Sequence, residues 1–226
     1  MPPLIHEPLC VLSPHLDDVA LSCSHFLATR TGATTVVTVL AGAPDGPPGH
    51  WNGRSTGMPT AREAIAVRRA EDAAAMRVLG ATPRWLDLPD RQYVGLQDSA
   101  TVEAAIRAAL DDADARTVLA PLGVHHPDHR AVADAALSLA RAGAIDDLSL
   151  YLDLPYARTM ADEVAPRLAE IRVHSDLEAL APVAATSDVK QRAVACYVSQ
   201  IEPVRADHPA LDDALRDPER YWRVVR

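Results

Sequence analysis

The feature that most constrains the fold is a regular alternation of short β-prone segments with longer segments of helical pattern. The β-prone segments are rich in Val, Thr and Leu. We expect strands at residues 9–12, 34–40, 84–88, 117–120 and 148–152, and helices at 18–31, 60–79, 101–112 and 128–141. Strands that alternate with helices form βαβ units with right-handed crossovers. The pattern therefore predicts an α/β fold, a Rossmann-like three-layer arrangement with a mainly parallel sheet and helices on both faces.

The C-terminal third has a less regular pattern. A helix is expected within residues 187–201, and residues 159–185 have room for a helix and a short strand. Residues 41–60 form a loop rich in Gly and Pro, long enough to indicate function or mobility. A chain of 226 residues has the size of one domain. We therefore expect one domain over residues 1–226, with an elaborated C-terminal part.

Composition excludes several classes of partner. Acidic residues outnumber Lys and Arg by 31 to 22, for a formal net charge of -9, so nucleic acid is not an expected partner. No apolar run approaches the roughly 18 residues of a membrane span, and the N-terminus lacks the basic start of a signal peptide. Cys10, Cys23 and Cys196 match no metal-ligand or disulfide pattern. These features favour a cytoplasmic protein that does not bind membranes.

A cluster of His and Asp follows the first expected strand. It reads Ser13-Pro14-His15-Leu16-Asp17-Asp18-Val19 and lies where the strand meets a helix. Ligands of open parallel sheets bind at the carboxyl ends of the strands, so these residues are candidates for a metal site. Asp is also a common helix N-cap, and capping alone is an alternative role for Asp17 or Asp18.

A second cluster follows the fourth expected strand and reads Gly123-Val124-His125-His126-Pro127-Asp128-His129. A solvated, His-rich loop is the alternative interpretation. If the first and fourth strands are neighbours, however, both clusters face one crevice at the sheet edge. Two imidazoles and one carboxylate leave a fourth position open for water, as in catalytic zinc sites.

The segments His15–Asp18 and His126–His129 together resemble the two signatures of the PIG-L/LmbE family, which are zinc-dependent deacetylases of N-acetylglucosaminyl compounds. Softer similarities to a bacterial branch of that family extend over most of the chain. The resemblance implies that Zn²⁺ is held by His15, Asp18 and His129. It also implies that several copies can assemble into a homo-oligomer.

The same resemblance implies roles for three further residues. Asp17 would be the general base that activates water, and His126, as an imidazolium, would stabilise the oxyanion or protonate the leaving amine. Asp128 would orient a histidine from outside the ligand set. Two positions depart from the family pattern, since Leu16 replaces the usual Pro and Val19 replaces the usual acid. Neither departure removes an expected ligand.

Candidate substrate-binding residues lie near the same edge. By resemblance, Asp90 would accept hydrogen bonds from sugar hydroxyls, and Asp153 is a comparable candidate after the fifth strand. Arg68 either reaches the pocket or pairs with a Glu on its own helix, and His125 either reaches substrate or faces solvent. Trp51, in the long loop, either stacks on a sugar ring or covers the core. Lys190 is the only lysine, with a surface or a catalytic role open.

The predicted function is hydrolysis of an N-acetyl or other N-acyl group from a small molecule that contains an amino sugar, such as a natural-product intermediate. Two alternatives remain open at this stage. One is a metal-dependent phosphoesterase, which would use two metals with extra carboxylates such as Asp90 and Asp153. The other is a non-catalytic, Rossmann-like protein that binds small molecules, although no Gly-x-Gly-x-x-Gly follows the first strand.

Overall fold

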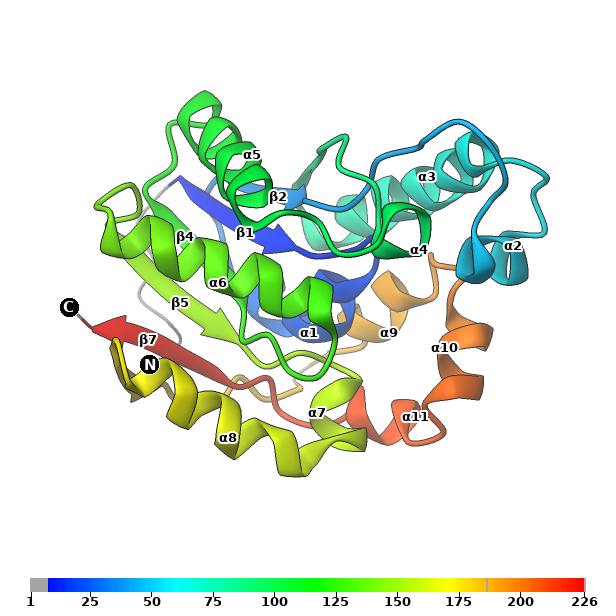
Figure 1. Cartoon of the computed structure of the whole chain (residues 1–226). Helices are drawn as coiled ribbons and strands as arrows, with labels where there is room; N and C mark the ends of the chain where they lie inside the picture. The colour runs from blue at the N-terminus through cyan, green and yellow to red at the C-terminus, as the bar shows by residue number, and fades with distance from the viewer. Residues whose placement is uncertain (1–7, 186, 226) are drawn as a thin grey trace.

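A seven-stranded sheet organises the molecule in the order β3-β2-β1-β4-β5-β7-β6 (Figure 1). The computed structural model describes residues 8–185 and 187–225. The strands are β1 (Leu9–Ser13), β2 (Thr34–Thr38), β3 (Thr82–Trp85), β4 (Thr117–Pro121), β5 (Asp147–Tyr151), β6 (Asp176–Ala179) and β7 (Tyr221–Val225). Strands β1 to β5 pair in parallel, whereas β7 is antiparallel to both β5 and β6. The predicted α/β fold with a mainly parallel sheet is confirmed.

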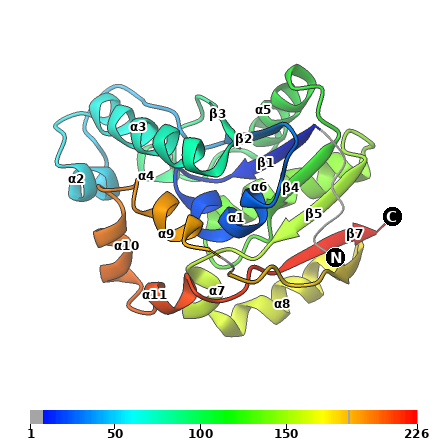
Figure 2. The same cartoon turned by 180° about the vertical axis from the view of Figure 1, so that it is seen from behind.

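Helices cover both faces of the sheet, as Figures 1 and 2 show from opposite sides. They are α1 (Asp18–Ala28), α2 (His50–Thr56), α3 (Ala61–Leu79), α4 (Arg91–Val94), α5 (Ser99–Asp112), α6 (Pro127–Arg141), α7 (Tyr156–Thr159), α8 (Ala161–Arg172), α9 (Val189–Val194), α10 (Ile201–Asp207) and α11 (Leu211–Ala214). Helices α1, α3 and α9 pack on one face, and α5, α6 and α8 on the other.

The alternation of side chains along β1 explains the two layers of core. Leu9 and Val11 point into the cluster under α1 and α3, and Cys10 and Leu12 point into the cluster under α5 and α6. Successive residues of a strand face opposite sides, and a parallel sheet covered on both faces needs apolar residues on each. The strand Leu9–Ser13 is accordingly buried throughout.

A buried ion pair joins Glu219, just before β7, to Lys190 of α9, and hydrogen bonds join the same carboxylate to α1. Lys190 Nζ lies 2.9 Å from Glu219 Oε1, and both side chains are 0% exposed. The same carboxylate accepts hydrogen bonds from the backbone of His25 (2.8 Å) and Phe26 (2.9 Å) and from the Tyr221 hydroxyl (2.8 Å). Lys190 is therefore not on the surface, and a side chain without solvent exposure is not available to a substrate, so both roles considered for it are wrong.

Candidate metal centre and pocket

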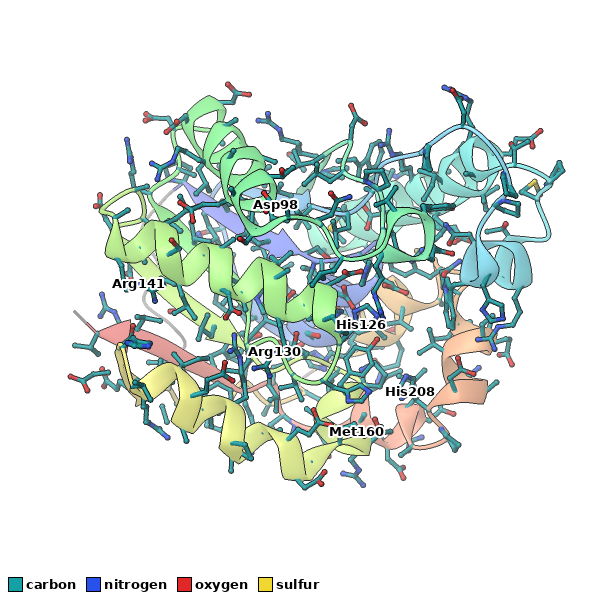
Figure 3. All side chains as sticks on the ribbon, in the orientation of Figure 1. Asp98, His126, Arg130, Arg141, Met160 and His208 are labelled. Carbon is teal, nitrogen blue, oxygen red and sulfur yellow. The ribbon has the colours of Figure 1, made fainter. Side chains whose placement is uncertain are left out.

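The two sequence clusters meet at one edge of the sheet. Strands β1 and β4 are parallel neighbours, so their carboxyl ends lie side by side. The chain leaves β1 for α1 on one face and leaves β4 for α6 on the other. This reversal opens a crevice at the strand ends, where ligands of such sheets bind. Figure 3 shows His126 at the end of α6 that borders this crevice.

Each of the two loops contains a non-glycine residue with a left-handed backbone. Asp17 has φ 132° and His125 has φ 63°, conformations that L-residues rarely adopt and that concentrate at functional sites. Asp17 occupies the N-cap of α1 but makes no capping hydrogen bond there. Helix capping therefore does not explain Asp17, and the turn leaves its carboxylate on the pocket wall.

Four side chains of types that can bind metal ions converge in the crevice. Asp18 Oδ2 lies 3.4 Å from His15 Nδ1 and 3.2 Å from His129 Nε2. His15, His126 and His129 each present a ring nitrogen, and these three atoms lie within 4.8 Å of one another. Asp18 and His129 are buried, whereas His126 is partly exposed to the pocket.

A carboxylate stands behind each of two imidazoles. Asp128 Oδ2 lies 3.0 Å from His15 Nε2, and Asp153 Oδ1 lies 2.7 Å from His129 Nδ1. Each contact occupies one ring nitrogen and leaves the other facing Asp18. A carboxylate that fixes the ring orientation in this way is usual for metal-binding histidines.

The donor set fits a zinc ion. His129 Nε2 is buried and faces Asp18 Oδ2 at 3.2 Å, but it makes no hydrogen bond of adequate geometry within the described residues, and its other nitrogen is held by Asp153. A buried polar atom without a hydrogen bond is costly, and a metal at this point would satisfy it. Two imidazole nitrogens and one carboxylate oxygen are ligands that catalytic zinc takes.

Burial and neighbouring charges separate the pKa values of the paired aspartates. Burial first, and then the negative charge of Asp18, raise the pKa of Asp17 to about 7. For Asp18 burial acts in the same direction, but the positive charges of His129 and His15, at 3.2 and 3.4 Å, outweigh it and hold the pKa of Asp18 well below the ordinary value. Asp18 is thus a permanent anion, whereas Asp17 can take up and release a proton near neutral pH.

His126 is placed to donate a hydrogen bond as a neutral ring. Burial first, and then the positive charges of His15 and His129, lower the pKa of His126 to about 3. Its Nδ1 accepts the backbone N–H of Asp128 at 3.3 Å, so the proton of the neutral ring is on Nε2. This environment therefore disfavours a further positive charge on His126, and the role expected for its imidazolium stays a prediction.

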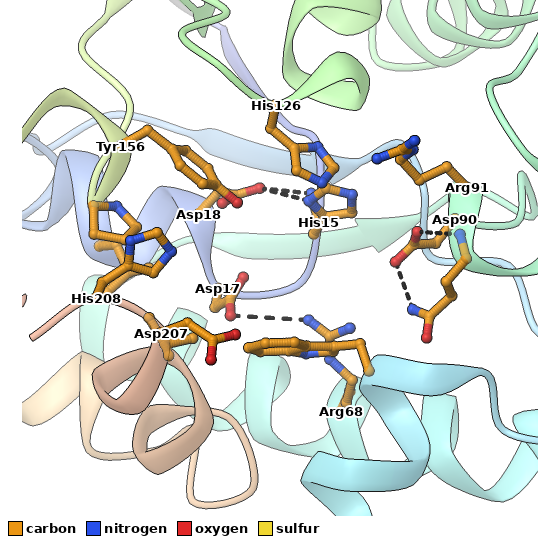
Figure 4. A pocket seen from close by; sticks show the side chains of 15 residues that line it. His15, Asp17, Asp18, Arg68, Asp90, Arg91, His126, Tyr156, Asp207 and His208 are labelled. Carbon is orange, nitrogen blue, oxygen red and sulfur yellow. Dashed lines mark hydrogen bonds and ion pairs between the residues drawn. The ribbon is translucent and has the colours of Figure 1, made fainter. Parts of the chain in front are cut away.

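A pocket of about 460 Å³ opens over these residues (Figure 4). Of the expected substrate-binding residues, Arg68 and Asp90 line it. Asp90 accepts hydrogen bonds from the backbone (3.0 Å) and the side chain (2.7 Å) of Gln92. Arg68 lies with its Nη2 3.8 Å from Asp17 Oδ2, and it donates to Leu16 O (2.9 Å) and Asn52 Oδ1 (3.0 Å). Among the described residues, Arg68 does not form the ion pair with a Glu of its own helix that was considered from the sequence.

The structure places the other two candidates away from the pocket wall. Asp153 is 0% exposed, and its second oxygen accepts the backbone N–H of Gly123 (2.9 Å) and Val124 (3.3 Å). It therefore supports His129 from behind and has no surface for substrate. His125 is exposed, with Nδ1 2.8 Å from Glu163 Oε1.

Several residues that line the pocket were not singled out from the sequence, among them Tyr156, Asp207 and His208. Tyr156 stacks on His126, with ring centroids 5.8 Å apart, and its ring edge meets His129 at 5.1 Å. Asp207 and His208 reach the pocket from the end of α10. Tyr156 follows Asp153 by three residues in a segment that resembled the family, which was the available signal. Nothing local in the sequence marks Asp207 or His208.

Comparison with known proteins identifies the family. The family model described as PIG-L, GlcNAc-PI de-N-acetylase, matches residues 10–140, which include both metal-binding clusters. The chain belongs to the PIG-L family. It is also 33% identical over 232 residues to 2'-N-acetylparomamine deacetylase of Streptomyces fradiae, covering 94% of this chain and 80% of that protein.

Solved structures of PIG-L-like deacetylases share the whole architecture. The zinc-inhibited form of teicoplanin deacetylase Orf2 has 25% identity and a TM-score of 0.77, with 96% of this chain and 98% of that chain covered. The A40926 pseudoaglycone deacetylase Dbv21 has 28% identity and a TM-score of 0.75, with 96% and 97% covered. These similarities confirm the expected family, fold class and N-deacetylase activity. The expected zinc cofactor agrees with both the family and the donor set.

Proposed function

We propose that this PIG-L family member hydrolyses the N-acetyl group of an amino sugar within a small molecule such as a natural-product intermediate, with Zn²⁺ as its cofactor. The observation that carries the proposal is the convergence of His15 and His129 ring nitrogens on one oxygen of Asp18, at 3.4 and 3.2 Å, with the Asp17 carboxylate beside them on the pocket wall. The relative that acts on 2'-N-acetylparomamine supports an amino-sugar substrate.

In this proposal His15, Asp18 and His129 hold the zinc. Asp18 is preferred to His126 as the third ligand because its oxygen lies between the other two donors, at 3.4 and 3.2 Å. An anionic ligand also offsets part of the metal charge in a buried site. When bound, zinc supplies a Lewis acid that polarises the acetyl carbonyl and lowers the pKa of water.

Asp17 is the proposed proton carrier. Its carboxylate lies on the pocket wall beside the ligands, with a pKa raised to about 7. It would take a proton from water as the water oxygen bonds to the acetyl carbon. It would then return that proton to the sugar nitrogen as the C–N bond breaks, which releases acetate and a free amine. Such a group contributes most when its pKa lies near the working pH.

His126 is the proposed donor to the developing oxyanion. Because its Nδ1 is occupied by a backbone N–H, its Nε2–H is free for the carbonyl oxygen. Stacking with Tyr156 at 5.8 Å restricts the ring orientation, so little reorganisation is needed when negative charge develops.

Arg68 and Asp90 are the proposed contacts to the N-acetylated sugar. Both line the pocket and are largely buried, with 4% and 8% exposed. Asp128 is proposed to orient His15.

We also propose one deacetylase domain over residues 1–226 and a cytoplasmic location. The location is supported by three unpaired cysteines. No helix of the described chain has the length and apolarity that crossing a membrane requires.

The phosphoesterase alternative has one observation in its favour. His15, Asp90 and Asp128 form a second group whose ligand atoms lie within 4.8 Å of one another. That group shares His15 with the first group, however. This favours one metal ion held by either group over two ions held at separate sites. The metal content distinguishes the two functions, because a phosphoesterase of this type would hold two ions.

The test combines metal analysis with acetate release. Purified protein is loaded with zinc and incubated with 2'-N-acetylparomamine, N,N'-diacetylchitobiose and N-acetylglucosamine, with p-nitrophenyl phosphate as the phosphoesterase probe. We expect one zinc ion per chain, acetate release from at least one N-acetyl sugar, loss of that activity with a chelator and its return with zinc. Phosphate release without acetate release would overturn the proposal.

A further inference from the structure

One side of the pocket has no role in the proposed chemistry. Trp51 of α2 and Asp207 and His208 at the end of α10 line it. In Figure 4, Asp207 and His208 lie on the opposite side of the metal centre from Asp90 and Arg91. The pocket therefore continues past the catalytic groups in a direction that neither Arg68 nor Asp90 serves.

Trp51 is held rigidly on this side. Its indole N–H donates to Gln200 Oε1 at 2.7 Å, and Gln200 is itself buried, with 1% exposed. The guanidinium of Arg54 lies over the indole, 4.7 Å from the ring centroid. A fixed aromatic ring that lines a pocket offers a flat apolar surface with little loss of side-chain entropy on binding.

Asp207 and His208 add polar groups next to this ring. Arg54 donates to both oxygens of Asp207, at 2.6 and 3.3 Å, which ties α2 to α10. The Asp207 side chain remains 43% exposed, and a carboxylate has about four acceptor positions, so it can still accept from a ligand. His208 Nδ1 contacts Thr159 Oγ1 at 3.3 Å, and the edge of Tyr156 packs on the ring at 5.3 Å.

An apolar face flanked by a carboxylate and an imidazole matches a ring that has C–H groups on its face and hydroxyl or ammonium groups at its edge. We infer that Trp51, Asp207 and His208 form a subsite for a second polar ring, attached to the N-acetylated sugar. The inference rests on the proposed function, because the acetyl group must lie at the metal centre. A pocket of about 460 Å³ is within the range of multi-ring ligands.

The subsite makes the enzyme selective for two-ring substrates. We expect kcat/KM for 2'-N-acetylparomamine or N,N'-diacetylchitobiose to exceed that for one-ring N-acetylglucosamine by about tenfold or more, since buried aromatic contacts of this kind dominate binding. Trp51→Ala should lower that ratio by about tenfold, and Trp51→Phe should keep most of it. Zinc content should not change in either variant.

Trp85 provides a matched control. Its indole N–H also donates to a side chain, Asp72, at 2.7 Å, and Arg69 lies over its ring at 5.5 Å, but it does not line the pocket. Trp85→Phe should therefore leave the two-ring to one-ring ratio at the wild-type value.

Calorimetric titration of the zinc-free protein with the same two-ring compounds separates this inference from the proposed function. Binding that weakens in Trp51→Ala, without turnover by the zinc-loaded wild type, would keep the subsite and overturn the deacetylase proposal. If acetate is released but Trp51→Ala leaves the two-ring to one-ring ratio of kcat/KM unchanged, the subsite is overturned and the deacetylase proposal is kept. If neither binding nor turnover occurs, both are overturned.

Discussion

Asp153 links His129, in the first turn of α6, to the backbone that follows β4. One carboxylate oxygen lies 2.7 Å from His129 Nδ1, and the other accepts the backbone N–H of Gly123 and Val124 at 2.9 and 3.3 Å. The residue that orients the imidazole therefore also fixes the end of β4 from which the loop begins. A change at Asp153 should act on the metal without any contact to it.

Asp153→Asn should weaken zinc binding by about 10–100-fold, the usual cost of losing a carboxylate behind a histidine ligand. An amide has one acceptor oxygen, so it cannot serve both His129 and the backbone. Competition with a chelator measures the affinity. Asp72→Asn is the control, since Asp72 is also buried and accepts from two side chains, Trp85 and Tyr197. Equal zinc affinity of Asp153→Asn and wild type would contradict the positioning role.

His129→Ala should remove most of the zinc, whereas His126→Ala should keep it. The proposed ligand set contains His129 and excludes His126, even though both rings offer a nitrogen within 4.8 Å of His15. In His126→Ala, kcat should fall by about 10²–10³-fold, the cost of one oxyanion donor. Elemental analysis with steady-state kinetics decides the point. Comparable zinc loss in the two variants would make His126 a ligand.

Asp17→Asn should retain zinc and lose turnover by about 10²–10⁴-fold, the contribution of a general base. Asn tolerates left-handed backbone, so the turn at φ 132° is preserved. With a pKa of about 7 before zinc binds, and lower beside the cation, Asp17 loses its base function as pH falls. Wild-type kcat/KM should therefore decline as pH falls, with an apparent pKa below 7 in the zinc-loaded enzyme. If the residual activity of Asp17→Asn declines over the same acidic pH range as that of the wild type, Asp17 is excluded as the base.

Lys190→Met should destabilise the protein by about 3–5 kcal/mol, because it leaves the buried Glu219 carboxylate without its cation. The comparison is Arg192→Met on the same helix, which breaks an exposed pair with Asp188, 59% and 75% exposed, and should cost less than about 1 kcal/mol. Urea unfolding followed by circular dichroism gives both values. Similar losses of unfolding free energy in the two variants would show that burial does not increase the contribution of the pair between Lys190 and Glu219.

His125→Gly should keep full turnover, because the structure places His125 outside the pocket and paired with Glu163 at 2.8 Å. At φ 63°, Gly is unstrained, whereas His125→Val should lose about 1–2 kcal/mol of stability to the left-handed backbone. Thermal unfolding and acetate release test the two variants. A large rise in KM in the Gly variant would restore His125 as a substrate contact.

The sequence was most informative where a strand runs directly into a motif. Strand β1 leads into His15 and Asp18, and β4 leads into His126 and His129, so local pattern and the geometry of parallel sheets together place these side chains at one edge. Asp153 also follows a strand, but strand position alone does not show that its carboxylate turns inward, to 0% exposure, to meet a histidine.

The rest of the pocket depends on contacts between distant segments. Trp51 reaches its place through Gln200, 149 residues away, and Arg54 through Asp207, 153 residues away. These contacts join two helices of 7 residues each, too short for a periodic pattern to predict. Strand β7 was missed although its residues, Tyr-Trp-Arg-Val-Val, favour β-structure. Its antiparallel place between β5 and β6 is set by pairing between distant segments.

The position of β7 also has a consequence for synthesis of the chain. Strand β6 (Asp176–Ala179) joins the sheet only through β7 (Tyr221–Val225), which is made some forty residues later. During translation the parallel strands can assemble as they emerge from the ribosome, but β6 must wait as an unpaired edge. The same late segment carries Glu219, which accepts hydrogen bonds from the backbone of His25 and Phe26 in α1, the helix that begins at Asp18. A nascent chain that stops short of it would hold the zinc ligands in sequence but not yet in a finished active site.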